Sequence, residues 1–233
     1  MSTIAELDRA TVADSCATKL NDAQLTEALW NLHAQLPDTE QRVFEDVEKV
    51  LREHTGFYTA PASSRFHLNS EGGLFRHSLG VTYRLWSFDG PYRLHPQYAY
   101  LDIFLVGLLH DLGKANQVTM QGTPEGRLYP AGIPYYSREP LKTRPGEYKY
   151  ARNKDRTVMS VPVGSLHTIA TLLSDFWKPS PDAWQAIAYH DGQYVPEGRH
   201  VAQSESKLLL ALHHADMFQC RYEGEWEKEN WTP

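Results

Sequence analysis

The sequence predicts an all-α fold that carries a small β insertion. Apolar residues recur at helical spacing in several segments, and 41% of the 233 residues are hydrophobic, which is enough for one substantial core. The segment 117–162 breaks this pattern because it is rich in Gly, Pro and Tyr and is too long for a plain connection. We therefore expect a bundle of helices with an inserted hairpin or flap.

The helices are expected in a definite order along the chain. Asp22 can cap the first of them, and a loop is expected over 57–73. A final helix should begin near residue 203 and include "SKLLLALHHADMFQCRY", and the acidic tail after Glu223 is expected to fray or to pack loosely. The other expected helices cover residues 22–35, 38–54, 74–88, 97–112, 163–176 and 181–190.

Charge and composition narrow the class of protein. The net charge of −6 means that the whole molecule does not match a polyanion electrostatically, so any nucleic-acid contact must be local. The N-terminus is polar, and no stretch approaches 18 apolar residues, which predicts a cytoplasmic protein without a membrane partner. The two cysteines do not form a CxxC pair, which argues against a disulfide framework or a zinc ribbon.

The insertion has a basic, tyrosine-rich composition. Between Arg138 and Arg156 there are seven Lys or Arg and three Asp or Glu, a local charge of +4. Such a surface suits a substrate with phosphates and a base to stack on, and Tyr136, Lys149 and Arg152 are the expected contacts. A solvated hairpin surface is the alternative.

The stretch "LLHDLGKAN" places two polar groups at the end of an apolar run. A helix C-terminus would explain Gly113 as a cap and Lys114 as a charge that complements the helix dipole. It does not explain why His110 and Asp111 follow apolar residues, since both are costly to bury without partners. A metal site would supply such a partner.

Two other helices supply matching residues. Asp216 lies on the same helix face as Leu209 and Leu212, and His77 lies in a helix whose neighbouring positions are apolar. Together with His110 and Asp111 they form a ligand set that suits Mn, Fe, Co, Ni or Zn, with Mg also acceptable. Four such ligands leave coordination positions for water and substrate, as a catalytic site requires.

A polar loop precedes the helix of His77. Arg65 has the geometry for bidentate phosphate binding, with Ser64 beside it. His67 is a candidate proton donor to a leaving oxygen.

The order His77, His110–Asp111, Asp216 and its local text resemble HD-domain metal-dependent phosphohydrolases. "GGLFRHSLGV", "LLHDLGKAN" and "LLLALHHADM" are similar to the three motif helices of bacterial and phage HD hydrolases, and related text occurs in HD-type 3′–5′ exoribonucleases and relaxases. The resemblance implies an HD-domain helical bundle over residues 57–223, with the insertion at 117–162. Residues 1–56 would be a helical lead-in packed on it and 224–233 a tail. The resemblance also implies that Lys114 faces substrate phosphate.

Two more histidines extend the resemblance. HD proteins with two metals have the pattern H…HD…H…H…D, in which His167 and His190 would bind the second ion. The text "VGSLHT" around His167 departs from the "GHGEKS"-like stretch of similar proteins. Three roles stay open for both residues: ligands of a second metal, contacts to substrate in a one-metal site, or core residues.

The expected function is hydrolysis of a nucleotidyl phosphoester by metal-activated water. Asp111, Lys114 and His67 would be the catalytic residues, and the partner would be a phosphate-containing small molecule or a short single-stranded nucleic acid. One alternative is a diiron oxygenase, because the resemblance extends to myo-inositol oxygenase. The other is a non-catalytic nucleotide-binding HD module.

Overall fold

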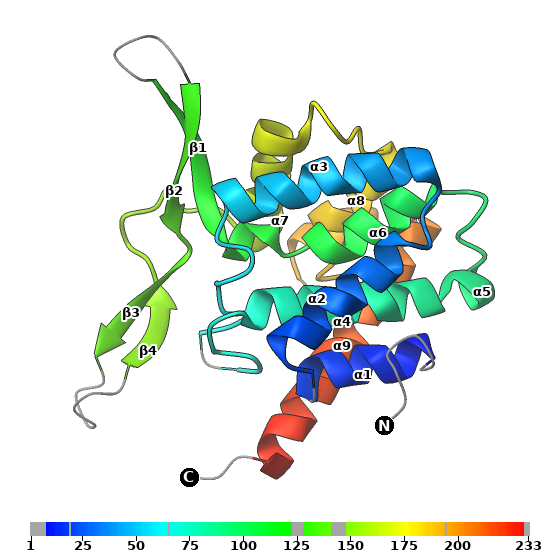
Figure 1. Ribbon diagram of the computed structural model, residues 1–233, viewed down its shortest axis with the longest axis horizontal. Coiled ribbons are helices and arrows are strands. Elements are labelled where there is room, and N and C mark those ends of the chain that lie inside the picture. The colour runs from blue at the N-terminus through cyan, green and yellow to red at the C-terminus, as the bar shows by residue number, and fades with distance from the viewer. Residues whose placement is uncertain are drawn as a thin grey trace.

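A body of helices carries two β-hairpins that project from one side in opposite directions (Figure 1). The computed structural model describes residues 8–18, 20–64, 66–122, 128–140, 148–193 and 195–230. The prediction of a mostly helical fold with a small β insertion is confirmed. The helices are α1 (Arg9–Thr18), α2 (Asp22–His33), α3 (Asp38–His54), α4 (Gly73–Ser87), α5 (Asp89–Tyr92), α6 (Tyr100–Leu109), α7 (Val161–Thr168), α8 (Pro181–Tyr189) and α9 (Lys207–Asn230).

The insertion forms two separate antiparallel pairs. Strand β1 (Asn116–Gly122) pairs with β2 (Leu128–Pro134), and β3 (Tyr136–Pro140) pairs with β4 (Tyr148–Arg152). In the second pair Tyr136 lies opposite Arg152, so the base of this hairpin is next to the helical body. The predicted flap is therefore two short ribbons.

Helix α4 is central to the body and packs against α1, α6 and α9. Its approach to α6 is close at Gly107, where an added Cβ would lie 2.9 Å from the Cα of Thr82. The apolar residues of all the long helices join one buried cluster. This close packing brings the first turns of α4, the C-terminal ends of α6 and α8 and the middle of α9 towards one region.

Helix α1, which lacks a clear amphipathic pattern in the sequence, is part of this core. Val12 and Cys16 are buried, and Arg76 of α4 donates hydrogen bonds to the carbonyl oxygens of Cys16 and Leu20 at 3.2 and 2.7 Å. The lead-in therefore packs on the remaining helices.

Helix α2 begins with a capping box one residue before the expected cap. The side chain of Asn21 accepts from the backbone N–H of Gln24, and the Gln24 side chain accepts from the N–H of Asn21. Expecting Asp22 as the cap was wrong because this reciprocal pair satisfies two orphan N–H groups at once.

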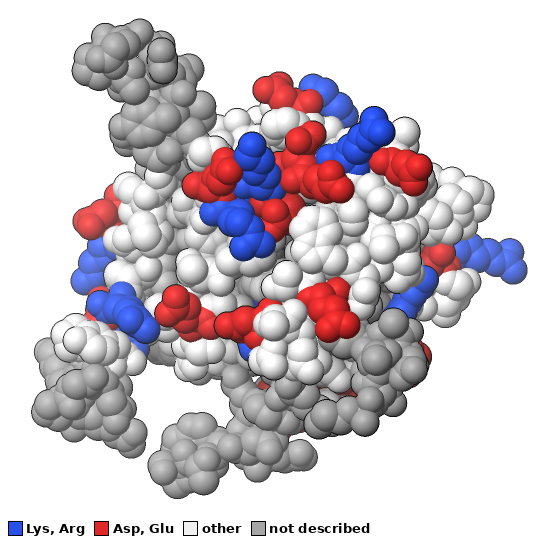
Figure 2. Space-filling view, viewed as in Figure 1, with Lys and Arg blue, Asp and Glu red and all other residues white. Residues whose placement is uncertain are grey.

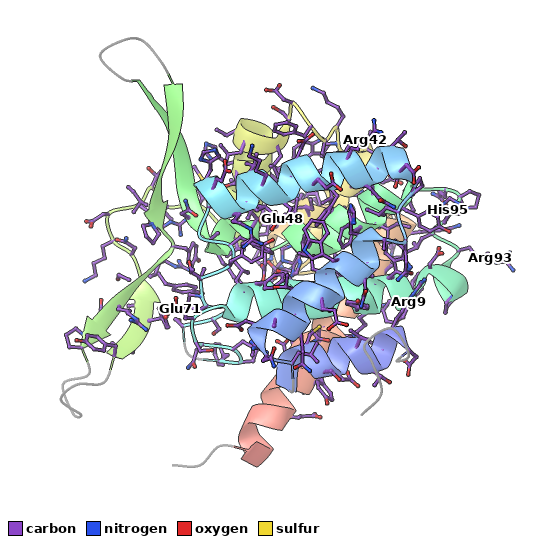
Figure 3. The ribbon with its side chains drawn as sticks, in the orientation of Figure 1. Arg9, Arg42, Glu48, Glu71, Arg93 and His95 are labelled. Carbon is purple, nitrogen blue, oxygen red and sulfur yellow. The ribbon has the colours of Figure 1, made fainter. Side chains whose placement is uncertain are left out.

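Helix α3 separates a charged outer face from a buried inner face. Arg42 points outward and Glu48 lies beneath the helix (Figure 3). Glu48 accepts a hydrogen bond from the Tyr58 hydroxyl at 3.0 Å and from Arg52 Nε at 2.9 Å. Over the outer face, acidic and basic side chains are interspersed (Figure 2), so this face has mixed charge rather than a continuous basic surface among the described residues.

The last helices differ from expectation at their ends. Helix α7 continues into a π-helical turn (Ile169–Leu173), within the helix expected over 163–176. Helix α9 continues to Asn230, so the segment after Glu223 is helical up to that residue. Within the described ranges, none of the helices combines the length and the apolar character needed to cross a membrane.

Candidate metal centre

The turn after α6 brings His110 and Asp111 to the centre of the site. Helix α6 ends at Leu109, and a 3-10 turn over Leu112–Lys114 follows. The Ser165 hydroxyl of α7 accepts from the Gly113 N–H and donates to the His110 carbonyl, both at 2.8 Å. These bonds tie α7 to the turn.

Gly113 is required by this packing and not by a helix cap. A Cβ at Gly113 would lie 2.3 Å from the carbonyl oxygen of Val161 and 2.8 Å from the N of Ser165. The glycines with positive φ within the described chain are Gly72 and Gly192, so the interpretation of Gly113 as a left-handed C-cap was wrong. The close approach of α7 explains the glycine.

Five ligand side chains converge at this turn from four parts of the body. His77 comes from α4, Asp216 from α9, and His190 follows the last residue of α8. The Nε2 atom of His77 lies 3.2 Å from Asp216 Oδ1 and 3.7 Å from Asp111 Oδ2. The Nε2 atom of His110 lies 3.8 and 3.6 Å from the same two oxygens. We call His77, His110, Asp111, His190 and Asp216 the metal cluster.

Each histidine of the metal cluster is oriented by a bond at its other ring nitrogen. The Nδ1 atom of His110 lies 2.8 Å from the Gly107 carbonyl, and that of His190 lies 2.9 Å from the Ile187 carbonyl. Since a carbonyl only accepts, both rings carry a proton on Nδ1, and in its neutral form each ring directs the lone pair of Nε2 to the centre. This is the orientation that a metal ligand needs.

The metal cluster fits a divalent ion. The Nε2 atoms of His77 and His110 are buried and have no hydrogen-bond partner of good geometry. Two ligands bound at 2.0–2.2 Å and separated by a right or tetrahedral angle lie about 3–3.5 Å apart, close to the distances across the cluster. His77, His110 and Asp111, and likewise His110, His190 and Asp216, bring one ligand atom each within 4.8 Å of one another.

Burial and three carboxylates set the charge of the histidines in the metal cluster. Burial opposes the charged form of His77 and of His190, but the carboxylates of Glu223 and Asp216 raise the pKa of His77 to about 10, and Asp111 raises the pKa of His190 to about 9. Burial lowers the pKa of His110 to about 4. Without a bound metal, His77 and His190 are therefore positively charged at neutral pH, and His110 is neutral.

Lys114 lies beside the metal cluster and forms an ion pair with Asp111 Oδ2. Burial opposes ionisation of Asp111, yet Lys114 and His110 hold its pKa well below the usual range. Asp111 Oδ1 lies 3.5 Å from His190 Nε2, so one oxygen of this carboxylate contacts His190 and the other contacts Lys114. A cavity of about 480 Å³ opens here, and its lining includes Lys114, Asp111, Asp216, His190, His67 and Arg152.

A carboxylate that sequence reasoning missed orients His77. Glu223 Oε2 lies 3.0 Å from His77 Nδ1, and its side chain is fully buried. Gln219 Nε2 donates to Glu223 Oε1 at 3.0 Å and to the Ala13 carbonyl at 3.1 Å, which connects helix α1 to the site. Glu223 is seven residues after Asp216, so a helix continued past Glu223 would have placed both on one face.

His67 and Cys220 form the rim of the cavity. His67 Nε2 lies 3.5 Å from Glu223 Oε2, and its ring centroid is 5.5 Å from that of His77. Cys220 Sγ lies 3.3 Å from Asp216 Oδ1 and 3.5 Å from His67 Nε2. The predicted catalytic position of His67 is thus next to the cluster, and Cys220 is a neighbour that was not predicted.

The base of the second hairpin places cations over an aromatic ring at the cavity. Tyr135 is buried, and the guanidinium groups of Arg156 and Arg152 lie 4.1 and 5.5 Å from its ring centroid. Tyr135 and Arg152 line the cavity, while Arg156 is 7% exposed. The structure thus places the predicted Arg152 at the site and adds Tyr135 and Arg156.

The other predicted substrate contacts are not among the described residues that line the metal cavity. Tyr136 packs edge-on against Tyr135, and burial raises its pKa to about 12. Lys149 pairs with Glu139 across the β3–β4 ribbon at 3.6 Å. Ser64 is half-buried outside the lining, and Arg65 lies outside the described residues.

The two additional histidines have different positions. His190 belongs to the metal cluster. His167, on α7, belongs to none of the groups that bring ligand atoms together in the described part of the chain. Its Nδ1 atom is buried without a hydrogen-bond partner. Ser165 is the residue of α7 that contacts the turn at Gly113. His167 is two residues later on the same helix and therefore lies on a different face.

Comparison with models of known protein families gave no match, and comparisons with curated proteins and with solved structures gave none either. The geometry and chemistry of the residues at the metal cluster are therefore the basis on which a function can be inferred.

Proposed function

We propose that the protein is an HD-type metal-dependent phosphohydrolase that acts on a nucleotidyl phosphoester. The metal cluster carries this proposal, because its buried and unpartnered Nε2 atoms face two carboxylates in a cavity that is also lined by cations. The order and local text of His77, His110–Asp111 and Asp216, which resemble those of HD hydrolases, support the same class. Mn, Fe, Co, Ni or Zn suits this donor set, and Mg is acceptable through the carboxylates.

The residues around the metal cluster have separate roles in this proposal. His77, His110, Asp111 and Asp216 would hold the ion, with His190 as a further ligand. A bound divalent ion would lower the pKa of water and polarise a phosphoryl oxygen. Lys114 and Arg152 would bind and neutralise phosphate oxygens. His67 would donate a proton to the leaving oxygen.

The cavity favours hydrolysis over the diiron oxygenase alternative. An oxygenase with the six-ligand pattern would need His167 beside the cluster, and none of the described metal-ligand groups includes it. The cationic lining by Lys114 and Arg152 suits an anionic substrate. Phosphate chemistry is thus the better match for the lining.

Metal analysis joined to a substrate panel tests the proposal. The purified protein would be loaded with Mn²⁺ and assayed with bis-p-nitrophenyl phosphate, deoxynucleoside triphosphates, cyclic nucleotides and short RNA and DNA. We expect phosphate or nitrophenolate release that disappears in Asp111→Ala together with the bound metal. Equal behaviour of the wild type and Asp111→Ala on every substrate would show that the hydrolase proposal is wrong. Tight nucleotide binding that survives Asp111→Ala would instead favour the non-catalytic module.

A further inference from the structure

A second cavity adjoins the metal cavity between α7 and α8. Its volume is about 390 Å³, within the ~300–1,000 Å³ range of small-molecule sites. It shares Ser160, Pro162 and Asp191 with the lining of the metal cavity, so the two are neighbours along one groove. Most of its other walls are apolar: Val163, Leu166, Ala188, Tyr189 and Val195.

The packing of α7 leaves these apolar side chains facing the second cavity. The opposite side of α7 is occupied, because Gly164 and Ser165 pack against the turn at Gly113. Val163 remains 51% exposed although it is apolar. Leu166 and Tyr189 pack against the core with part of their surface and line the second cavity with the rest. A partly exposed apolar wall next to a metal cluster is typical of a ligand subsite.

The two cavities differ in their cationic lining. Lys114 and Arg152 line the metal cavity and not the second cavity. The polar residues that line the second cavity are Ser160, Asp191, Glu197 and His200. Apolar walls with a few polar groups match a heteroaromatic ring, whose faces are apolar and whose edges form hydrogen bonds. Pro162 and Tyr189 offer flat surfaces for such a ring.

We infer that the second cavity binds the aromatic ring of the substrate, a nucleobase in chemical class, while its phosphoryl group lies in the metal cavity. This inference rests on the proposed function and adds a specificity subsite to it. Val163, Leu166 and Tyr189 are the residues that determine the preference for a ring.

Binding of two phosphonates to the Mn²⁺-loaded protein tests this subsite without turnover. Phenylphosphonate and methylphosphonate present the same anionic head and differ in the ring, and isothermal titration calorimetry measures both affinities. We expect phenylphosphonate to bind at least about tenfold more tightly, because the ring leaves water for an apolar wall. Equal affinities would overturn the subsite and leave the proposed function standing. If neither phosphonate binds, the proposed function fails and the subsite fails with it.

Two variants at exposed apolar positions test whether the preference for phenylphosphonate depends on the second cavity. Val163→Gln puts a polar amide into the second cavity, and the exposure of Val163 makes the change compatible with folding. We expect it to bring the ratio of the two phosphonate affinities to within about twofold. Ile133→Gln is the matched control, since Ile133 is 37% exposed and lies on β2 outside the lining of both cavities, and it should keep the wild-type ratio. A Val163→Gln variant that keeps the wild-type ratio would contradict the subsite.

Discussion

The helical body and the β-hairpins contribute to the same cavity by different means. In the body, the ligand histidines are buried, and each is oriented at Nδ1 by a carbonyl or a carboxylate. Among the described residues of the hairpins, those at the cavity are Tyr135 and Arg152 at the base, whereas Tyr148 is 61% exposed. Under the proposed function, the helices would bind the metal and the attached ribbon would help to bind the substrate, so variants should separate the two effects.

The largest effect is expected from a ligand of the helical body. His110→Gln removes a buried imidazole ligand, and we expect loss of bound metal and a fall in kcat/KM of at least about 100-fold. Arg152→Gln in the hairpin should keep the metal and raise KM by about tenfold or more. Metal content by mass spectrometry and steady-state kinetics measure both. His54→Gln, at the exposed end of α3, is the matched control. Loss of metal from Arg152→Gln would remove the distinction between the two regions.

Metal binding should release protons from the helical body. His77, with a pKa of about 10, and His190, with a pKa of about 9, carry protons at pH 7, and a metal must displace both. The apparent metal affinity should therefore rise with pH, by about 100-fold per unit between pH 7 and 9, and level off above the two pKa values. Calorimetry in buffers of different ionisation enthalpy would count close to two protons. A pH-independent affinity would contradict this charge state.

A smaller effect is expected at the carboxylate behind His77. Glu223→Gln keeps the shape of the side chain and removes the charge that supports the imidazole, so metal affinity should fall by about 10–100-fold. Competition with a chelator measures this affinity without reference to activity. Glu225→Gln, two residues later and exposed, should leave it unchanged. The same loss in both variants would point to a general effect on α9.

The smallest effect is expected in the scaffold away from the cavity. Tyr58→Phe keeps the ring under the Arg52 guanidinium and removes the hydroxyl that donates to Glu48. We expect the free energy of unfolding to fall by about 1 kcal/mol and Tm by about 2–4 °C, with metal affinity unchanged. Thermal denaturation with Tyr148→Phe as the exposed control measures this. A change in metal affinity would mean that the scaffold and the site are coupled.

The residues of the site that could be predicted from the sequence are polar residues that lie in apolar helical segments. His77, His110, Asp111 and Asp216 each lie in an apolar helical context, and a carboxylate or imidazole in such a place needs a partner. The periodicity that identified these helices also set which face each residue occupies. Their meeting in one cluster is what the structure adds to that expectation.

Other features of the site depend on contacts between residues from different elements, which local sequence patterns do not predict. His167 and His190 looked equivalent in the sequence, but only His190 reaches the cluster, because α7 turns its inner face to Gly113. The sequence did not single out Glu223 as part of the site, because its partner, His77, is 146 residues away. Lys149 looked like a phosphate contact by composition, yet a neighbouring strand supplies Glu139 as its partner.

The sequence by itself determined a mostly helical body, a basic β insertion and four polar residues in apolar helices, because periodicity and the cost of buried charge are local properties of the chain. The tertiary structure decided the rest: that His190 completes the cluster, that Glu223 supports His77, and that an apolar cavity adjoins the metal cavity. These depend on how helices distant in sequence pack, and packing distances of a few ångströms select which side chains can meet.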